Sequence, residues 1–124
     1  MDNKSAVAAL AALAQETRLA VFRLLVEAGR EGMPVGAIAD RLSLPGSTLS
    51  FHLKELAHAG LIATHPRGRI ILCTANFERM AALMTFLTQN CCRGMPETCL
   101  SVMETALSRC CASARLKRKA GVRS

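Results

Sequence analysis

The chain has 124 residues, of which 51% are hydrophobic and none is Trp or Tyr, a composition that predicts a modest aliphatic core. Its formal net charge of +7 comes from the C-terminal end. Six basic residues and no acidic one lie from Arg109 onward, which leaves ten basic against nine acidic residues in residues 1–108. The high charge alone therefore does not identify the body of the chain as a nucleic-acid-binding protein.

The same composition indicates the cellular compartment. No stretch approaches the roughly 18 apolar residues that a membrane span requires. The Ala-rich run Ala6–Ala14 has only Lys4 as a basic residue before it and continues into another helix pattern, unlike a secretory signal. We therefore expect a cytoplasmic protein with no membrane partner. In that reducing compartment, six cysteines suit free thiols, metal ligands or redox sensors better than a disulfide framework.

The first predicted elements are two helices. An Ala/Leu-rich helix is expected from about Ser5 to Ala14, and a second helix covers Glu16–Ala28 before Gly29 and Gly32 end it. The apolar face of the second helix is predicted to consist of Leu19, Phe22, Leu25 and Val26.

Two further helices are separated by a Pro/Gly break. Val35–Leu42 is a short amphipathic helix, and Ser43–Gly46 is the turn that follows it. Ser47–Ala59 is the next helix, and Gly60 is placed to end it in a left-handed cap. The core-facing stripe of this helix consists of Leu49, Leu53 and Leu56, spaced four and three residues apart. The order is that of a helix-turn-helix, with a polar face on the second helix.

A β-hairpin is predicted next. Leu61–His65 and Ile70–Thr74 are short apolar runs on either side of Pro66–Arg69. Two arginines, Arg67 and Arg69, lie at the expected tip. They suit contacts with a DNA minor groove or with flanking phosphates.

The last strongly patterned helix is predicted over Phe77–Gln89, with Asn76 placed to cap it. Its apolar stripe consists of Met80, Leu83, Met84 and Leu87. This stripe and the helix Ser5–Ala14 are more apolar than one small core absorbs, so we expect them to pair in a two-fold dimer. Such a dimer presents its recognition helices to successive major grooves, roughly 34 Å apart. The alternative is that both stripes complete the core of a monomer.

The stretch ADRLSLPGSTLSFHLKELAHAGLI, followed by the tip His65-Pro66-Arg67-Gly68-Arg69, resembles the DNA-reading core of the ArsR family of winged-helix repressors. The resemblance extends from the LAQETRLAVFRLL opening at Leu13 to about Leu87. It implies a mainly α fold, a winged helix-turn-helix with a two-stranded β-hairpin wing. It also implies a homodimeric transcriptional repressor that binds double-stranded operator DNA, with a palindromic site.

The DNA-binding residues are expected on the polar face and on the wing. Base edges or adjacent phosphates would be read by Ser47, Thr48, Ser50, Phe51 and His52, and backbone or minor-groove contacts would come from Lys54, Arg67 and Arg69. His52 and His58 are expected at the groove or the surface. Phe51 has two open interpretations, contact with a thymine methyl group and burial against the wing.

Three cysteines lie just beyond the last of these helices. Cys91, Cys92 and Cys99 surround a break made by Gly94 and Pro96. Adjacent residues of a continuous helix point about 100° apart, so Cys91 and Cys92 could not easily share an ion there. Because Gly94 lets the chain turn and Pro96 favours a new helix start, Cys99 can fold back towards the pair.

Three thiolates without histidine or carboxylate suit a soft ion. Zinc normally takes a fourth ligand, whereas arsenite needs only three thiolates because its lone pair occupies the remaining direction. The pattern also resembles the arsenic site beyond the dimer helix in one branch of the ArsR family. That resemblance implies trivalent arsenic as effector, held by Cys91, Cys92 and Cys99, and control of an arsenic-resistance operon. The stretch VGAIADRL lacks the cysteines that other branches place there.

Several alternatives stay open at this stage. The same repressor could sense thiol oxidation or another soft ion such as zinc, cadmium or antimonite. Cys110 and Cys111 could form a second soft-ion site, a redox pair or neither. Cys73 is expected to be a buried hydrophobe, although its spacing from Arg79 matches the Cys-x5-Arg loop of thiol arsenate reductases. That match lacks glycines, and we expect no enzyme.

The expected domain organisation follows from these elements. Residues 1–108 form a DNA-binding and dimerisation domain that includes the cysteine segment, and residues 109–124 form a basic, partly disordered tail that could contact phosphates.

Overall fold

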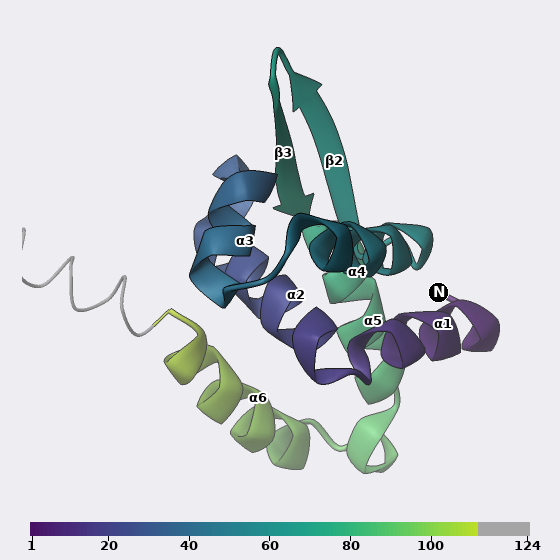
Figure 1. Ribbon diagram of the computed structural model, residues 1–124. Coiled ribbons are helices and arrows are strands. Elements are labelled where there is room, and N and C mark those ends of the chain that lie inside the picture. Colours follow the sequence, from purple (N-terminus) through teal and green to yellow (C-terminus); the bar gives the residue numbers. More distant parts are fainter. Residues whose placement is uncertain (112–124) are drawn as a thin grey trace, which may run out of the picture. The chain divides into compact units, whose positions relative to one another are not determined.

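The computed structural model describes residues 1–111 and divides the chain into two compact units, residues 1–87 and residues 88–124. Figure 1 shows the elements of both units. The first unit contains α1 (Asn3–Leu13), α2 (Glu16–Ala28), η1 (Gly29–Glu31), β1 (Met33–Pro34), α3 (Val35–Leu42), α4 (Gly46–His58), β2 (Ile62–Arg67), β3 (Ile70–Ala75) and most of α5 (Phe77–Thr88). The second contains η2 (Cys91–Gly94) and α6 (Pro96–Cys110). None of the helices in residues 1–111 has the length and hydropathy needed to span a bilayer.

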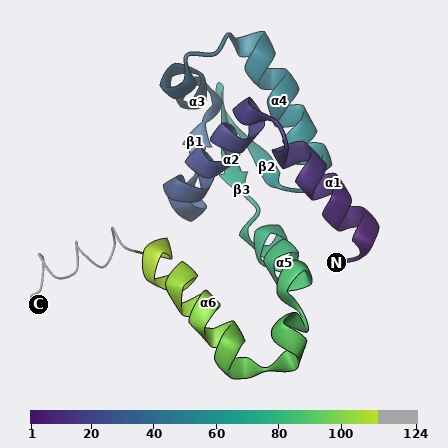
Figure 2. The ribbon, with the colours of Figure 1, turned by 90° about the horizontal axis from the view of Figure 1, so that it is seen from below.

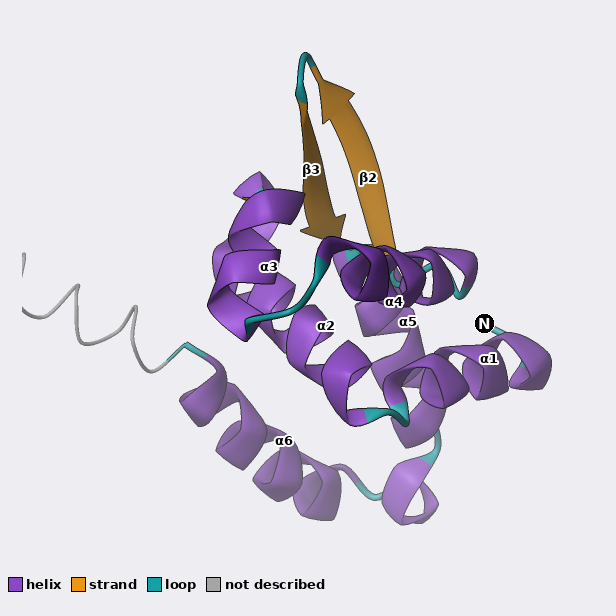
Figure 3. Ribbon diagram, viewed as in Figure 1, coloured by secondary structure: helices purple, strands orange, loops and turns teal. Residues whose placement is uncertain are grey.

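The three strands form one antiparallel sheet in the order β1-β3-β2. The predicted hairpin is confirmed, and Figure 3 shows it projecting beyond the helices of the first unit. The pairing of Arg67 with Ile70 leaves a two-residue turn in which Gly68 has a φ of 63°. Strand β1 was not predicted, because a two-residue strand that contains Pro34 has no recognisable pattern in the sequence.

The end of α4 confirms the predicted left-handed cap. Gly60 has a φ of 78°. Its N–H donates to the Ala57 carbonyl at 2.9 Å, and the N–H of Leu61 donates to the Leu56 carbonyl at 3.0 Å. These two bonds are those of a Schellman motif, which ends the helix and directs the chain into the wing.

The core of the first unit lies around α2, which packs against α1, α3, α4 and β3 (Figure 2). Its largest fully buried side chains are Leu25, Ile38, Leu49, Leu56, Leu61, Val21 and Cys73. The predicted apolar face of α2 is partly wrong: Leu19 is 44% exposed, and Val21 is buried in its place. The small residues Ala6 and Ala9 of α1 are buried, which lets that helix approach the core closely.

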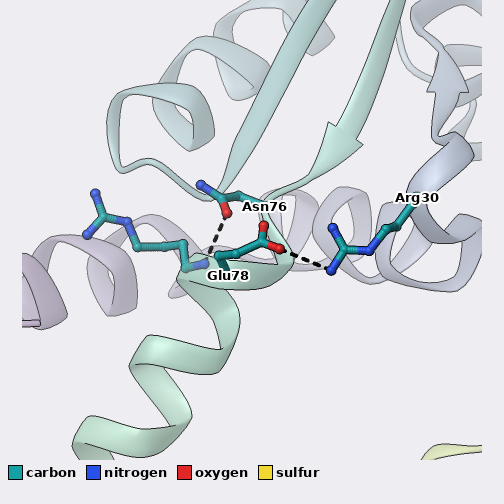
Figure 4. Close-up of polar contacts among 4 residues, drawn as sticks. Arg30, Asn76 and Glu78 are labelled. Atoms are coloured by element: carbon teal, nitrogen blue, oxygen red, sulfur yellow. Dashed lines mark hydrogen bonds and ion pairs between the residues drawn. The ribbon is translucent and has the colours of Figure 1, made fainter.

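The start of α5 is held by a predicted cap. The Asn76 side chain accepts the N–H of Arg79 at 3.0 Å and donates to the Gly60 carbonyl at 2.9 Å, so it joins α5 to the end of α4. Figure 4 shows Asn76 beside an exposed ion pair between Arg30 and Glu78, at 3.0 Å. The backbone N–H of Glu78 and then Arg30 lower the pKa of that carboxyl group.

Candidate DNA-binding surface and thiol cluster

The polar face of α4 is exposed. Of the side chains predicted to read DNA, those exposed on this helix are Ser47, Thr48, Ser50, Phe51 and Lys54. Phe51 is 57% exposed, which excludes its burial against the wing within one chain. No side chain caps the N-terminus of α4, so its first N–H groups remain available to an outside acceptor such as a phosphate.

The predicted position of His52 is wrong. It was predicted at the groove, but it is only 9% exposed and lies on the core side of α4. Its Nδ1 lies 3.4 Å from a guanidinium nitrogen of Arg18. The signal was present in the sequence: His52 follows Leu49 by three residues and precedes Leu56 by four, which places it on the buried stripe. Arg18 was not predicted as a functional residue, because a basic residue in a helix carries no sign of its distant partner. His58 is exposed, as predicted.

The wing presents both of its arginines. Arg67, at the end of β2, and Arg69, in the turn, are exposed. His65 lies lower on the same strand, where its Nε2 is 3.1 Å from the Thr74 hydroxyl oxygen. The wing therefore offers two exposed cationic side chains near the tip of the hairpin.

Cys91 is the centre of a thiol cluster in the second unit, made of Cys91, Cys92 and Cys99. The Sγ atom of Cys91 lies 3.1 Å from that of Cys99 and 3.5 Å from that of Cys92. All three side chains are half-buried. Within residues 1–111, no three His, Cys, Asp or Glu side chains form a ready metal-binding group, so the cluster consists of two thiol contacts that share Cys91.

A left-handed turn places these thiols. Asn90, Cys92, Arg93 and Gly94 have φ values of 61°, 56°, 57° and 75°. Left-handed backbone costs roughly 1–2 kcal/mol at each residue other than glycine, so the turn holds conformational strain. The turn is followed by α6, which begins at Pro96, as predicted. Cys99 in the first turns of α6 thereby reaches Cys91.

The contacts also change the acidity of the central thiol. Cys99, and then Cys92, raise the pKa of Cys91 to about 12. The physical cause is that a neutral thiol donates to a neighbouring sulfur, whereas a thiolate in the same place is repelled by it. Cys91 is thus protonated at neutral pH.

The other three cysteines lie elsewhere. Cys73 is fully buried in β3, and burial raises its pKa. The segment from Cys73 to Arg79 is a strand end followed by a helix cap, which contradicts a phosphate-binding loop. Cys110 and Cys111 are exposed at the end of α6, with sulfurs 3.8 Å apart. The predicted tail begins at Arg109, and the basic residues proposed to contact phosphates from Arg115 onward lie outside the described residues.

The first unit also exposes apolar side chains on two helices. Val7 and Leu10 of α1 are 56% and 42% exposed, and Met84 and Leu87 of α5 are 53% and 58% exposed. Leu83, on the same predicted stripe, is buried. Packing within one chain therefore buries only some of the apolar side chains of α1 and α5.

Comparison with known sequences supports the helix-turn-helix. Residues 13–65 match a family model described as a helix-turn-helix domain. The HTH-type transcriptional regulator YceK of Bacillus subtilis (strain 168) is 38% identical over 58 residues, a match that covers 47% of this chain. The match spans 57% of YceK, a little over half of its length.

Solved structures share the fold. HlyU from Vibrio cholerae N16961 is 30% identical with a TM-score of 0.57, over 72% of this chain and 96% of HlyU. The ArsR family transcriptional regulator RHA00566 is 26% identical with a TM-score of 0.62, over 73% of this chain and 90% of that protein. A homodimeric winged helix-turn-helix DNA-binding domain from Mycobacterium bovis, 24% identical over 70% of this chain and 81% of that domain, has a TM-score of 0.56. The helix-turn-helix, the wing and these matches together show that the chain belongs to the ArsR family of winged-helix transcriptional regulators.

Proposed function

We propose that the protein is a homodimeric repressor of an arsenic-resistance operon, released from palindromic operator DNA when trivalent arsenic binds Cys91, Cys92 and Cys99. The observation that supports arsenic most directly is that the sulfur of Cys91 contacts the sulfurs of both Cys92 and Cys99. The DNA-binding part of the proposal is supported by the exposed polar face of α4 and the wing arginines.

Two of the three sulfur separations are compatible with a three-coordinate ion. A tetrahedral zinc ion with Zn–S bonds of about 2.3 Å separates its sulfurs by about 3.8 Å. A three-sided pyramid with bonds of similar length and angles near 90° brings them to about 3.3 Å. The two contacts of Cys91, at 3.1 and 3.5 Å, lie on either side of the pyramidal value.

Proton balance favours the same ligand. Arsenous acid, As(OH)₃, exchanges three As–OH bonds for three As–S bonds, and each thiol proton leaves with a hydroxide as water. Arsenic stays trivalent throughout. A divalent cation must instead drive each thiol proton into solution. Because the pKa of Cys91 is raised to about 12 by Cys99 and Cys92, this cost is high for a cation at neutral pH.

The proposed release mechanism follows from chain connectivity. Only two residues separate the end of α5 from Cys91, so a change in the left-handed turn acts directly on the end of that helix. If α5 is a dimer helix, a small change there alters the separation of the two recognition helices. The ion must bind the DNA-incompetent arrangement more tightly, and couplings of this kind amount to roughly 1–3 kcal/mol.

The dimer is supported by the exposed faces of α1 and α5. We expect Leu87→Glu to weaken dimerisation by at least about tenfold, because each protomer loses a buried leucine and gains a charge at the interface. The measurement is sedimentation velocity over a range of protein concentrations. Thr85→Glu is the matched control, since Thr85 is exposed on a different face of α5. Equal effects of the two changes would place the interface elsewhere.

The proposed contacts of the wing arginines with DNA phosphates can be tested separately. Arg67→Ala and Arg69→Ala should each weaken binding to all DNA sequences alike and lower the slope of log K against log salt by about 1, because each removes one phosphate contact. Arg23→Ala is the control, as an exposed arginine on α2 with only a weak pair to Glu27. An unchanged salt slope in both wing variants would mean that the wing does not touch DNA.

A second candidate signal is thiol oxidation, favoured by the same 3.1 Å contact between the Cys91 and Cys99 sulfurs. An oxidant such as peroxide would take two electrons and two protons from this pair to form a disulfide. Reversal of the release by a reductant, without arsenite, would distinguish this mechanism.

Cys110 and Cys111 are proposed as a second, weaker soft-ion site. Their sulfurs approach to 3.8 Å because α6 ends at Cys110, so Cys111 no longer follows helical geometry. Two thiols without a third ligand hold an ion less tightly than the cluster around Cys91.

The test of the proposed function is fluorescence anisotropy of a labelled DNA fragment from upstream of the protein's own gene. The label is on the DNA because the chain contains no Trp. Arsenite, antimonite, zinc, cadmium and peroxide are titrated separately under defined reductant. Release by arsenite at the lowest concentration is the expected result. Release only by peroxide, or only by zinc or cadmium, would overturn the arsenic assignment and leave DNA binding intact.

A further inference from the structure

One side chain joins three helices of the first unit. Arg18 lies in the first turn of α2, and its Nε donates to the Ala12 carbonyl at 2.7 Å, at the C-terminal end of α1. Its Nη1 lies 3.4 Å from Nδ1 of His52, in the middle of α4. The backbone N–H of Arg18 donates to the Gln15 side chain at 2.9 Å, which fixes the start of α2. Helices α1, α2 and α4 pack against one another around this contact.

The contact constrains the ring of His52. A guanidinium group only donates hydrogen bonds, so a hydrogen bond in this contact has Nδ1 of His52 as its acceptor, and the tautomer that allows it carries its proton on Nε2. His52 is 9% exposed among buried leucines, where a polar nitrogen without a partner is unfavourable. Arg18 therefore selects both the orientation and the tautomer of this ring.

The other buried side chains of α4 are apolar and form no directional contact like that between His52 and Arg18. Leu49, Leu53 and Leu56 are buried, and apolar contacts of this kind permit small rotations of a helix about its axis. A hydrogen bond has a preferred direction and length. Phe51 is the chain neighbour of His52 and points about 100° away around the helix. Fixing His52 therefore fixes where Phe51 and the other exposed side chains of α4 point.

We propose that Arg18, through His52, is a positioning residue that sets the rotation of the recognition helix α4. The DNA part of this inference rests on the proposed function. Arg18 itself does not contact DNA in this scheme. Loss of the contact leaves α4 folded but turned, so base contacts are lost while phosphate contacts persist.

The experiment compares Arg18→Met, His52→Leu and His52→Asn in the full chain, at a temperature where each variant is folded by circular dichroism. Asparagine keeps an acceptor near the position of Nδ1, whereas leucine keeps only the volume. The readout is the ratio of affinities for operator and random DNA. We expect Arg18→Met and His52→Leu to lower this ratio about tenfold, the loss of roughly one base contact, with random DNA bound as before. His52→Asn should keep most of the wild-type affinity ratio, and Arg23→Met should leave the ratio unchanged.

A purely structural role gives a different result. In that case Arg18→Met and His52→Leu lower the midpoint of unfolding while the affinity ratio stays at the wild-type value, and the proposal fails. A second readout does not depend on DNA: the ¹⁵N shifts of the His52 ring. Wild-type protein should show a proton on Nε2 alone, and Arg18→Met a mixture of tautomers. A wild-type proton on Nδ1 overturns the inference even if the protein binds DNA, whereas a correct tautomer without any DNA binding refutes only the proposed function.

Discussion

Cys99→Ser is expected to abolish release from DNA by arsenite while leaving DNA affinity within about twofold of wild type. The Cys99 sulfur is one of the two that contact Cys91, and it is supplied by α6, beyond the left-handed turn. Without it the ion binds only the adjacent pair and no longer joins the two sides of the turn. A coupling of roughly 1–3 kcal/mol corresponds to about a 5- to 150-fold change in DNA affinity, and this change should disappear.

The measurement is the same DNA anisotropy titration, with arsenite and reductant present. Cys110→Ser is the matched control, because it makes the identical substitution on the same helix at an exposed thiol. It should leave the release from DNA by arsenite unchanged, because the site proposed at Cys110 and Cys111 is weaker and lies at the opposite end of α6 from the left-handed turn. A normal response in Cys99→Ser would remove Cys99 from the site, and a lost response in Cys110→Ser would move the site to the end of α6.

Gly32→Ala is expected to destabilise the fold far more than Gly29→Ala, although the two glycines share one backbone conformation. Gly29 has φ and ψ of 75° and −162°, and Gly32 has 73° and −165°. This region is essentially restricted to glycine, so alanine costs roughly 1–3 kcal/mol at either position. A Cβ on Gly29 would meet nothing within 4 Å, whereas one on Gly32 would clash with the Cys73 carbonyl oxygen.

The additional cost at Gly32 is about 1–3 kcal/mol, typical of overpacking, because the atom in the way is backbone of the central strand β3 and cannot rotate aside. Urea denaturation of both variants and wild type gives the three free energies of unfolding. The difference between the variants isolates the contact from the backbone strain. Equal destabilisation would show that β1 and β3 separate easily, and that the close approach at Gly32 contributes little.

The helix-turn-helix and the wing could be predicted from the sequence because their signals are local. The leucine spacing in α4, the Pro45-Gly46 break and Gly60 each depend on residues within one or two turns. The cap at Asn76 is local as well, and its bond to the N–H of Arg79 confirms it. The approach of Cys99 to Cys91 was expected on the same grounds, from Gly94 and Pro96. Its use as an arsenic site remains a proposal.

Other features depended on partners distant in sequence. Strand β1 exists because Met33 and Pro34 meet β3 about forty residues later, and two residues alone have no periodicity. Leu19 and Val21 both suit a helix interior, and only the packing of α2 decided that Val21 is buried. Phe51 and His52 are neighbours whose exposures differ sharply for the same reason.

The order of the helices, the wing and a cysteine group beyond α5 follow from local sequence signals, because spacing, turn residues and caps act over a few residues. The contact of His52 with Arg18, 34 positions away, and the contact of Cys91 with two other thiols depend on how the chain folds in space. Both outcomes depend on how helices and turns are oriented in space. That orientation is the sum of many packing contacts, and no short stretch of residues specifies it.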